Sequence, residues 1–482
     1  MANKPEEENG KSNCSNTISV VEYDVTLIVD ECATSPKKAE VFYDKEIALN
    51  RALITTALAA YVKSGKSCFD PVRCLDGIGA SGVAGLLWKK HVRDNMAVTI
   101  NDSREKAYER IKENTQLNNL DVQVLNRDAC ALLHEHAYNF ISLDCHRGAA
   151  FYLDSAFRNL PKGGILAITT TDDAALHAIT PEIALRNYGG FIMRTFYSKE
   201  LAVRLFLAAV ARAAARYNKG LHVLCSVAFK SSFTVIVTVK RGPTHANKSI
   251  RNIRKLIHCS MCEDRTFYPL TNYPIESPSS LLGCGCSRRL PGKVTLELGP
   301  VWCGSIFNEE FLAAMRHHSV KFPWKVKADV LLKQLIAEAR CSSKNEINLL
   351  HPQEENLIEK SETDEEEANP TKRLKLENDM PPYKEELKSE DVLSDTTKEN
   401  ENNDFTITLD SDNEPAPAFY FNLHRHSPKG PQLLRVDTVI QFLRKAGYRA
   451  SRTHFDREAV RTNATLSNLT KILTEAANIN AQ

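Results

Sequence analysis

The sequence predicts an α/β fold in which a doubly wound, largely parallel sheet is followed by a smaller α+β body. Five strand-like runs, at 72–76, 97–101, 122–125, 139–143 and 164–169, alternate with helical stretches. Such alternation is typical of a parallel sheet with helices on both faces. Two further runs, His222–Phe229 and Phe233–Val239, follow each other directly and indicate an antiparallel edge. We assign residues 18–240 to this first domain.

A glycine-rich turn follows the first of these runs. It contains Gly77, Gly79, Gly82 and Gly85 and comes directly after Asp76. One alternative is that such a turn merely lets a helix pack close to a strand. Here Asp102 ends the next run, where a carboxylate can bind both hydroxyls of a ribose, and this favours a nucleotide-type cofactor. Asp76 suits a cationic amino-acid group better than a pyrophosphate, which favours S-adenosylmethionine over NAD.

Another carboxylate, Asp144, stands at the carboxyl end of the apolar run 140–143 and begins the loop Asp-Cys-His-Arg-Gly. Open α/β sheets bind their ligands at this edge, so Asp144 is a candidate reactive group. The alternative is that Asp144 only caps the helix that follows.

These motifs resemble those of the S-adenosylmethionine-dependent tRNA (guanine-N2)-dimethyltransferases, and the resemblance covers most of the chain. It begins at VFYDKEIALNRALITTAL, continues through DGIGASG, INDSREKAYERIKENTQLN, NRDA and ITTTDDAALH, and ends in LRKAGYRASRTHFDREAVRTNA. The resemblance implies a Rossmann-like class I methyltransferase domain. It also implies that the cofactor is bound by Arg51, Asp76, Gly77, Asp102, Asp128 and Ala129.

The catalytic loop departs from the family pattern, which is Asp-Pro-Phe/Tyr-Gly, and is similar to that of a divergent eukaryotic branch. The N2 of guanine is a weak nucleophile, because its lone pair is delocalised into the ring. A site must therefore orient N2 toward the sulfonium methyl and accept its proton. We expect Asp144 to accept the proton and His146 to stack on the flipped base. The expected product is N2-methyl- or N2,N2-dimethylguanosine at or near position 26 of tRNA.

A second class of function stays open at this point. An RNA-binding scaffold or chaperone could keep the methyltransferase fold and have lost most of its catalytic power. The altered loop favours this hypothesis, whereas the acidic residues Asp76, Asp102 and Asp128 favour an enzyme that binds a sulfonium cofactor.

Charge is distributed unevenly along the 482 residues. Residues 341–415 contain 8 Lys/Arg and 22 Asp/Glu, with Tyr383 and Phe405 as the only aromatic residues, and this predicts a disordered acidic insert. The rest is basic, with formal charges of +10 over 1–340 and +6 over 416–482, as expected for a partner with a phosphate backbone. We assign 241–340 and 416–475 to one C-terminal tRNA-binding domain, and 1–17 to a disordered N-terminus.

The segment after residue 430 predicts helices near 431–446 and 465–473 around a basic, hairpin-like stretch. Within it, four residues could follow the phosphates of an RNA stem: Arg449, Arg452, His454 and Arg461. The alternative is a small winged-helix-like body whose arginines are simply solvated. Arg204, Arg212 and Arg216 belong to a different, Ala/Leu-rich helix, and we expect them on its water-facing side.

Thirteen cysteines in an intracellular protein indicate thiols and metal rather than disulfides. Cys259 and Cys262 form a CxxC pair, and Cys284 and Cys286 form a CxC pair, a spacing close to that of structural Zn²⁺ sites. Cys303 is an alternative to Cys286 as the fourth ligand. Cys145 is expected to line the pocket, because methylation of an amine needs no thiol nucleophile.

The remaining signals concern location and assembly. No apolar run reaches the ~18 residues that a membrane-spanning helix needs, and the polar N-terminus has no secretory signal. The cluster PTKRLKLE, with Lys372, Arg373 and Lys375, is typical of a nuclear import signal. We expect a soluble nuclear protein, with the nucleolus as one candidate compartment, that acts on tRNA as a monomer and has no membrane partner.

Overall fold

The computed structural model describes residues 16–31, 41–93, 95–146, 148–230, 232–270, 275–292, 294–341, 418–428 and 434–480. The predicted N-terminal tail and acidic insert, including the candidate import signal, lie almost wholly outside these residues. Within the described ranges, no helix is long and apolar enough to cross a membrane.

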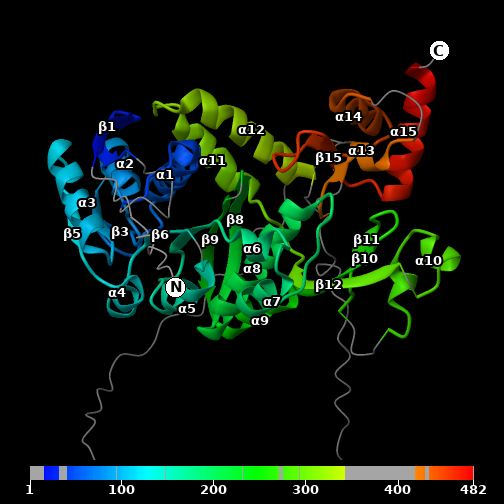
Figure 1. Cartoon of the computed structure of the whole chain (residues 1–482), viewed down its shortest axis with the longest axis horizontal. Helices are drawn as coiled ribbons and strands as arrows, with labels where there is room; N and C mark the ends of the chain where they lie inside the picture. Colours follow the sequence, from blue (N-terminus) through cyan, green and yellow to red (C-terminus); the bar gives the residue numbers. More distant parts are fainter. Residues whose placement is uncertain are drawn as a thin grey trace, which may run out of the picture. The chain divides into compact units, whose positions relative to one another are not determined.

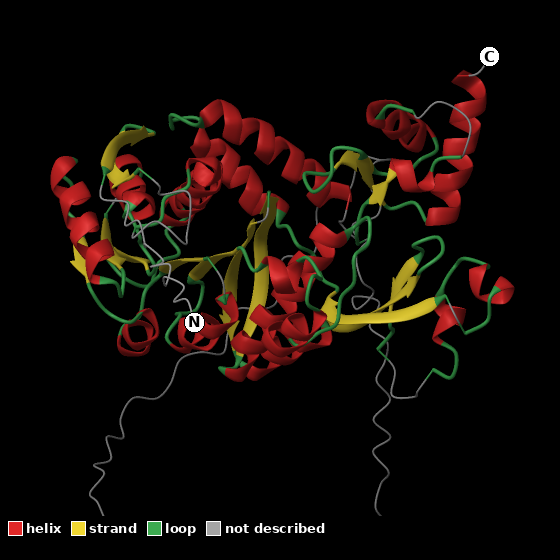
Figure 2. Cartoon of the chain, viewed as in Figure 1, coloured by secondary structure: helices red, strands yellow, loops and turns green. Residues whose placement is uncertain are grey.

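Seven strands form the central sheet, in the order β5-β4-β3-β6-β7-β9-β8 (Figures 1 and 2). Five of them are parallel: β3 (Val72–Asp76), β4 (Met96–Asn101), β5 (Gln123–Leu125), β6 (Phe140–Cys145) and β7 (Ile165–Thr170). The hairpin of β8 (Lys219–Phe229) and β9 (Ser232–Arg241) completes the sheet. β9 lies between β7 and β8 and is antiparallel to both, so the edge strand is β8. The predicted parallel sheet with an antiparallel edge is confirmed.

Helices cover both faces of this sheet (Figure 1). One face carries α1 (Ala48–Lys63), α2 (Val83–His91) and α3 (Glu105–Leu117), and the other carries α4 (Ala129–Glu135), α5 (Leu153–Arg158) and α8 (Ser198–Arg216). The strands are nearly continuous apolar runs because both of their faces are buried; all six residues of β7 are buried, for example. The shorter helices here are η1 (Lys45–Ile47), η2 (Ala149–Tyr152), α6 (Asp173–Leu176) and α7 (Pro181–Tyr188). The hairpin of β1 (Thr17–Glu22) and β2 (Val25–Asp30) packs on α2 and α3.

The middle of the chain forms a small antiparallel sheet and a helical hairpin. α9 (Pro243–Arg251) leads into the sheet of β10 (Ile253–Cys259), β11 (Arg265–Phe267) and β12 (Thr295–Trp302), with η3 (Pro278–Leu281) and α10 (Cys286–Arg289) in its long loop. α11 (Glu309–Ser319) and α12 (Lys325–Cys341) then pack on α1. Trp324 Nε1 donates to Thr56 Oγ1 at 3.0 Å and so fastens the start of α12 to α1.

The last part of the chain has its own apolar core. It consists of β13 (Phe421–Asn422), α13 (Leu423–His426), α14 (Val436–Lys445), β14 (Ala450–Arg452), β15 (Ala459–Thr462) and α15 (Leu466–Asn480). Leu443, Val460 and Leu469 lie at the centre of that core. The two predicted helices and the hairpin between them are therefore confirmed.

A buried ionic network connects α8, α12 and β15. Arg461 Nη2 donates to Glu200 Oε2 at 2.6 Å, and its Nε donates to Glu338 Oε2 at 3.1 Å. Glu200 also accepts from Arg204 Nε at 3.0 Å, one turn along α8. Only 2% of Arg204 is exposed, so the expectation that it faces water was wrong. Arg212 is half-buried and donates to the Tyr188 carbonyl, while Arg216 is exposed and pairs with Asp154.

Candidate functional site

A cavity of about 490 Å³ opens at the carboxyl ends of β3, β4, β6 and β7. This is the edge at which the strand order reverses, between β3 and β6, where sheets of this kind bind ligands. Its lining brings together residues that are far apart in the sequence: Arg51, Asp76, Asp102, Asp144 and His146. All five are among the residues that the sequence nominated.

The glycine-rich turn is shaped by close packing against the strands. A Cβ atom on Gly77 would lie 2.6 Å from Leu143 Cδ2, and one on Gly79 would lie 2.6 Å from Ile100 Cγ2. Gly77 N donates to the Ser142 carbonyl at 2.9 Å and so holds the turn against β6. Gly77 thus shapes the turn, whereas Ile78, Gly79 and Ala80 line the cavity.

Two carboxylates flank this turn and are oriented by backbone amides. Asp102 accepts from Ala80 N at 2.9 Å and from Arg104 N at 3.0 Å. Asp76 accepts from Gly85 N at 3.1 Å and is almost fully buried. Burial, with the nearby charges of Asp144 and Asp102, raises the pKa of Asp76 to about 7. A cationic ligand beside Asp76 would favour its ionised form.

Asp128 and Ala129 lie at the start of α4. Asp128 is the N-cap of this helix and accepts from Ala131 N at 2.8 Å, while Ala129 is buried. Neither residue is among those that line the cavity. Tyr152 does line it, and burial, followed by Cys145, Cys130 and Asp128, raises the pKa of its phenol.

Asp144 is held at the end of β6, partly exposed to the cavity. The caps of the next two helical segments are Gly148 and Tyr152, so Asp144 caps neither of them. Burial raises the pKa of Asp144, and the guanidinium of Arg51 opposes that shift. The neighbouring Cys145 is buried, which raises the pKa of its thiol well above the usual range. A neutral thiol is no nucleophile, as expected for a lining residue.

Arg51 is oriented by a carboxylate that the sequence did not reveal. Its Nε donates to Glu22 Oε1 at 2.9 Å and its Nη2 donates to the Asp44 carbonyl at 2.8 Å. Glu22 lies on β1, far from α1 in the sequence, and both side chains of this ion pair are buried. Arg51 therefore has a fixed position next to Asp144.

Aromatic rings lie near the loop that begins at Asp144. His146 is exposed, and its Nδ1 lies 3.1 Å from Thr171 Oγ1. The ring of Phe42 lies 5.8 Å from the His146 ring, tilted by 42°. Phe229, the last residue of β8, lines the same cavity, as does the next residue, Lys230, which pairs with Glu46. Phe42 lies in the first family-like segment, so its motif could have identified it; Phe229 and Lys230 carry no local signal.

The four predicted metal ligands come together. One ligand atom from each of Cys259, Cys262, Cys284 and Cys286 lies within 4.8 Å of the others. Four thiolates at this separation suit a tetrahedral structural Zn²⁺ site. Cys303 is buried after the end of β12 and is not in this group, which favours Cys286 as the fourth ligand.

The four predicted RNA-binding residues lie in different surroundings. Only 1% of the Arg461 side chain and 5% of the His454 side chain are exposed, and both bind Glu338. Arg461 and His454 therefore belong to the buried network and do not lie on a surface that RNA could contact. Arg452 is exposed and pairs with Asp437, and Arg449 lines a second cleft beside β14.

Comparisons with known proteins agree with this geometry. The N2,N2-dimethylguanosine tRNA methyltransferase family matches residues 23–340 and 322–474. The tRNA (guanine(27)-N(2))-dimethyltransferases of Rattus norvegicus and Homo sapiens are each 37% identical over 91% of this chain, which spans 61% of their length. The tRNA (guanine(26)-N(2))-dimethyltransferase of Methanosarcina acetivorans is 26% identical, covering 91% of this chain and 92% of that protein.

The fold is also found in a solved structure. Trm1 from Pyrococcus horikoshii, in complex with S-adenosyl-L-methionine, superposes with a TM-score of 0.65 at 20% identity. The match covers 94% of this chain and 99% of that chain. The Rossmann-like methyltransferase fold predicted from the sequence is confirmed, and the chain belongs to the N2,N2-dimethylguanosine tRNA methyltransferase family.

Proposed function

We propose that this protein transfers methyl groups from S-adenosylmethionine to the exocyclic N2 of a guanosine in tRNA. One observation carries the proposal: the same cavity holds the glycine-rich turn with Asp102 and, on the neighbouring strand β6, the carboxylate of Asp144. A cofactor on the turn and a base beside Asp144 would then share one enclosed space.

The charges of the cavity suit a cationic cofactor. Five carboxylates line it, from Asp44, Glu46, Asp76, Asp102 and Asp144. Of the cations in the lining, Arg51 is paired with Glu22, Arg104 with Asp102 and Lys230 with Glu46. S-adenosylmethionine, when bound, supplies an electrophilic methyl carbon on a positively charged sulfur. Asp102 would hold the ribose hydroxyls, and Asp76 would face the cationic amino-acid end.

The chain's own residues would orient the base and remove its proton. Phe42 and His146 would hold the flipped guanine by stacking. Asp144 would accept the N2 proton, and its raised pKa makes it a stronger base than an ordinary carboxylate. Because Asp144 is partly exposed, it can release that proton to solvent before a second methyl transfer. Such a cycle would give the dimethylated product.

We propose position 27 as the target, because the relatives with 37% identity over 91% of this chain are named for guanine 27. The test is methylation of tRNA transcripts by the purified full chain, followed by mass spectrometry of the nucleosides. A transcript with guanosine at 27 and another base at 26 should yield N2,N2-dimethylguanosine. A transcript with guanosine at 26 and another base at 27 should not. The reverse pattern would assign the chain to position 26. Binding of tRNA and cofactor without any methylated nucleoside would instead support the scaffold hypothesis, which nothing in the described cavity favours.

We further propose that Cys259, Cys262, Cys284 and Cys286 hold a structural Zn²⁺ ion. The apolar residues Ile257, Leu282 and Val294 pack around these cysteines, and a small cluster of this kind gains stability from a metal crosslink.

We also propose that the protein is nuclear and monomeric. Imaging tests its location, and light scattering tests its oligomeric state.

A further inference from the structure

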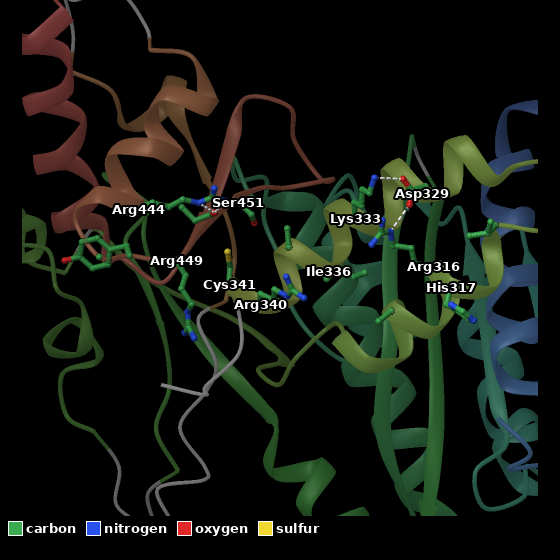
Figure 3. A pocket seen from close by; sticks show the side chains of 16 residues that line it. Arg316, His317, Asp329, Lys333, Ile336, Arg340, Cys341, Arg444, Arg449 and Ser451 are labelled. Atoms are coloured by element: carbon green, nitrogen blue, oxygen red, sulfur yellow. Dashed lines mark hydrogen bonds and ion pairs between the residues drawn. The ribbon is translucent and has the colours of Figure 1, made fainter. Parts of the chain in front are cut away.

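A second cleft, of about 870 Å³, lies between the α11–α12 hairpin and the segment from α14 to β14. Figure 3 shows Arg316 and Lys333 on one wall, Arg444 and Arg449 on the other, and Arg340 between them. Among the described residues that line this cleft, Asp329 is the one carboxylate. The cleft is therefore strongly basic.

Part of this charge is compensated, since Arg340 Nε pairs with Glu309 Oε1 at 2.7 Å, but two of the cations share one carboxylate and a third binds a neutral oxygen. Arg316 Nε and Lys333 Nζ share the carboxylate of Asp329, each at 2.7 Å. Arg444 donates through Nε and Nη2 to the Ala450 carbonyl, which is a neutral acceptor. Lys333 is 58% exposed, so an anion in the cleft can reach it.

The two walls are held together beneath the cleft. Glu338 of α12 accepts from Thr453 Oγ1 and from His454 N, both at 2.8 Å, as well as from Arg461 of β15. α12 is in turn fastened to α1 through Trp324 and Thr56. The cations therefore lie on a framework that also carries Arg51 of the catalytic cavity, and a preorganised site loses less entropy on binding.

We propose that this basic cleft binds backbone phosphates of the tRNA substrate and holds the RNA while the target guanosine occupies the catalytic cavity. The inference rests on the proposed function. Guanidinium groups suit phosphate because their planar fork donates two parallel hydrogen bonds. Arg449, which the sequence nominated for RNA, lies in this cleft; Arg316, Lys333, Arg340 and Arg444 are additional members from other elements.

The test removes one cation from each wall without touching the Glu338 network. The variant Lys333→Gln/Arg444→Gln is compared with Lys327→Gln/Lys445→Gln, which removes the same charge from exposed positions on α12 and α14 outside the cleft lining. Fluorescence anisotropy with labelled tRNA measures the dissociation constant at several salt concentrations. We expect the cleft variant to bind on the order of ten-fold more weakly, with a salt slope smaller by roughly two units, and the control to stay near the parent.

Methyl transfer is measured in parallel, so that the two proposals fail separately. The cleft variant should raise KM for tRNA and leave kcat at saturating tRNA unchanged. Methylation by the parent together with equal binding by both variants would overturn the cleft proposal and leave the enzyme proposal standing. A parent without methyl transfer would overturn the enzyme proposal, while the salt slopes would still test the cleft. Displacement of tRNA by an equal charge concentration of poly-glutamate would overturn the assignment to phosphate.

Discussion

Replacing Arg461 by alanine should destabilise the protein severely, because it would leave two carboxylates buried without their shared cation. Glu200 and Glu338 are both fully buried, and Arg461 donates to each of them. Burial alone would raise the pKa of Glu200, but the charges of Arg461 and Arg204 lower it to about 2. The network is therefore fully charged at neutral pH.

The expected magnitude follows from that burial. Removing one partner of a buried ion pair costs about 3–5 kcal/mol, against a total stability of roughly 5–15 kcal/mol for a typical domain. Because the unfolding entropy is roughly 2.1 cal/mol/K per residue and the folded part of this chain is long, that corresponds to a fall in Tm of roughly 5 °C. Arg452→Ala is the matched control from the same hairpin, because its pair with Asp437 is exposed on both sides. Such a surface pair contributes about 0–1 kcal/mol.

Thermal unfolding of the two variants, followed by circular dichroism, measures the difference. The stability that Glu200 contributes is present above its ordinary pKa of 4.5 and is lost as the pH falls toward about 2. The difference between Arg461→Ala and the parent should therefore be full at pH 7 and should shrink in strong acid. Equal Tm values for Arg461→Ala and Arg452→Ala at pH 7, with weaker tRNA binding by the former, would refute the buried-network role and restore Arg461 as a phosphate contact.

Three further predictions concern the cofactor, the metal and the base. Since the pKa of Asp76 is about 7 without ligand, affinity for S-adenosylmethionine should rise roughly ten-fold from pH 6 to 8, with proton release in calorimetry; a flat profile in the parent, or an unchanged slope in Asp76→Asn, would contradict this. Cys284→Ser should lose about one zinc per chain by elemental analysis while Cys303→Ser retains it; equal metal content would exclude the four-cysteine site. Phe42→Ala should reduce kcat/KM for tRNA on the order of ten-fold without changing cofactor affinity, and an unchanged value would remove Phe42 from the base site.

The parts of the site that could be predicted from the sequence depend on strand ends. A buried parallel strand is a short apolar run, and its carboxyl end faces the ligand, so Asp102 and Asp144 could be assigned before any contact was known. The paired cysteines could also be predicted from the sequence, because their spacing is typical of metal sites in which a loop brings two pairs together. The choice between Cys286 and Cys303 needed the path of β12, which spacing alone does not give.

The parts that could not be predicted depend on partners far along the chain. Arg461 lies in a basic segment whose composition is typical of RNA-binding surfaces. Nothing in the neighbouring sequence distinguishes a buried arginine from an exposed one at this position. Its burial follows from Glu200, which lies 261 residues earlier, on α8, whereas Arg461 is on β15. Arg51 is likewise positioned by Glu22 from a separate hairpin, and Phe229 lines the cavity from the end of β8, which β9 separates from β7. Long-range charge pairing and strand insertion leave no local signal.

The role of Asp144 as proton acceptor is tested most directly by single-turnover methyl transfer with the Asp144→Asn variant. Asparagine keeps the shape of the side chain but cannot accept the N2 proton, so binding of cofactor and tRNA should persist while the rate falls on the order of 10²-fold or more. Asp173→Asn is the control, because Asp173 is an exposed carboxylate after the neighbouring strand. It should react at the parent rate. An Asp144→Asn variant as fast as the parent and the control would contradict catalysis by Asp144.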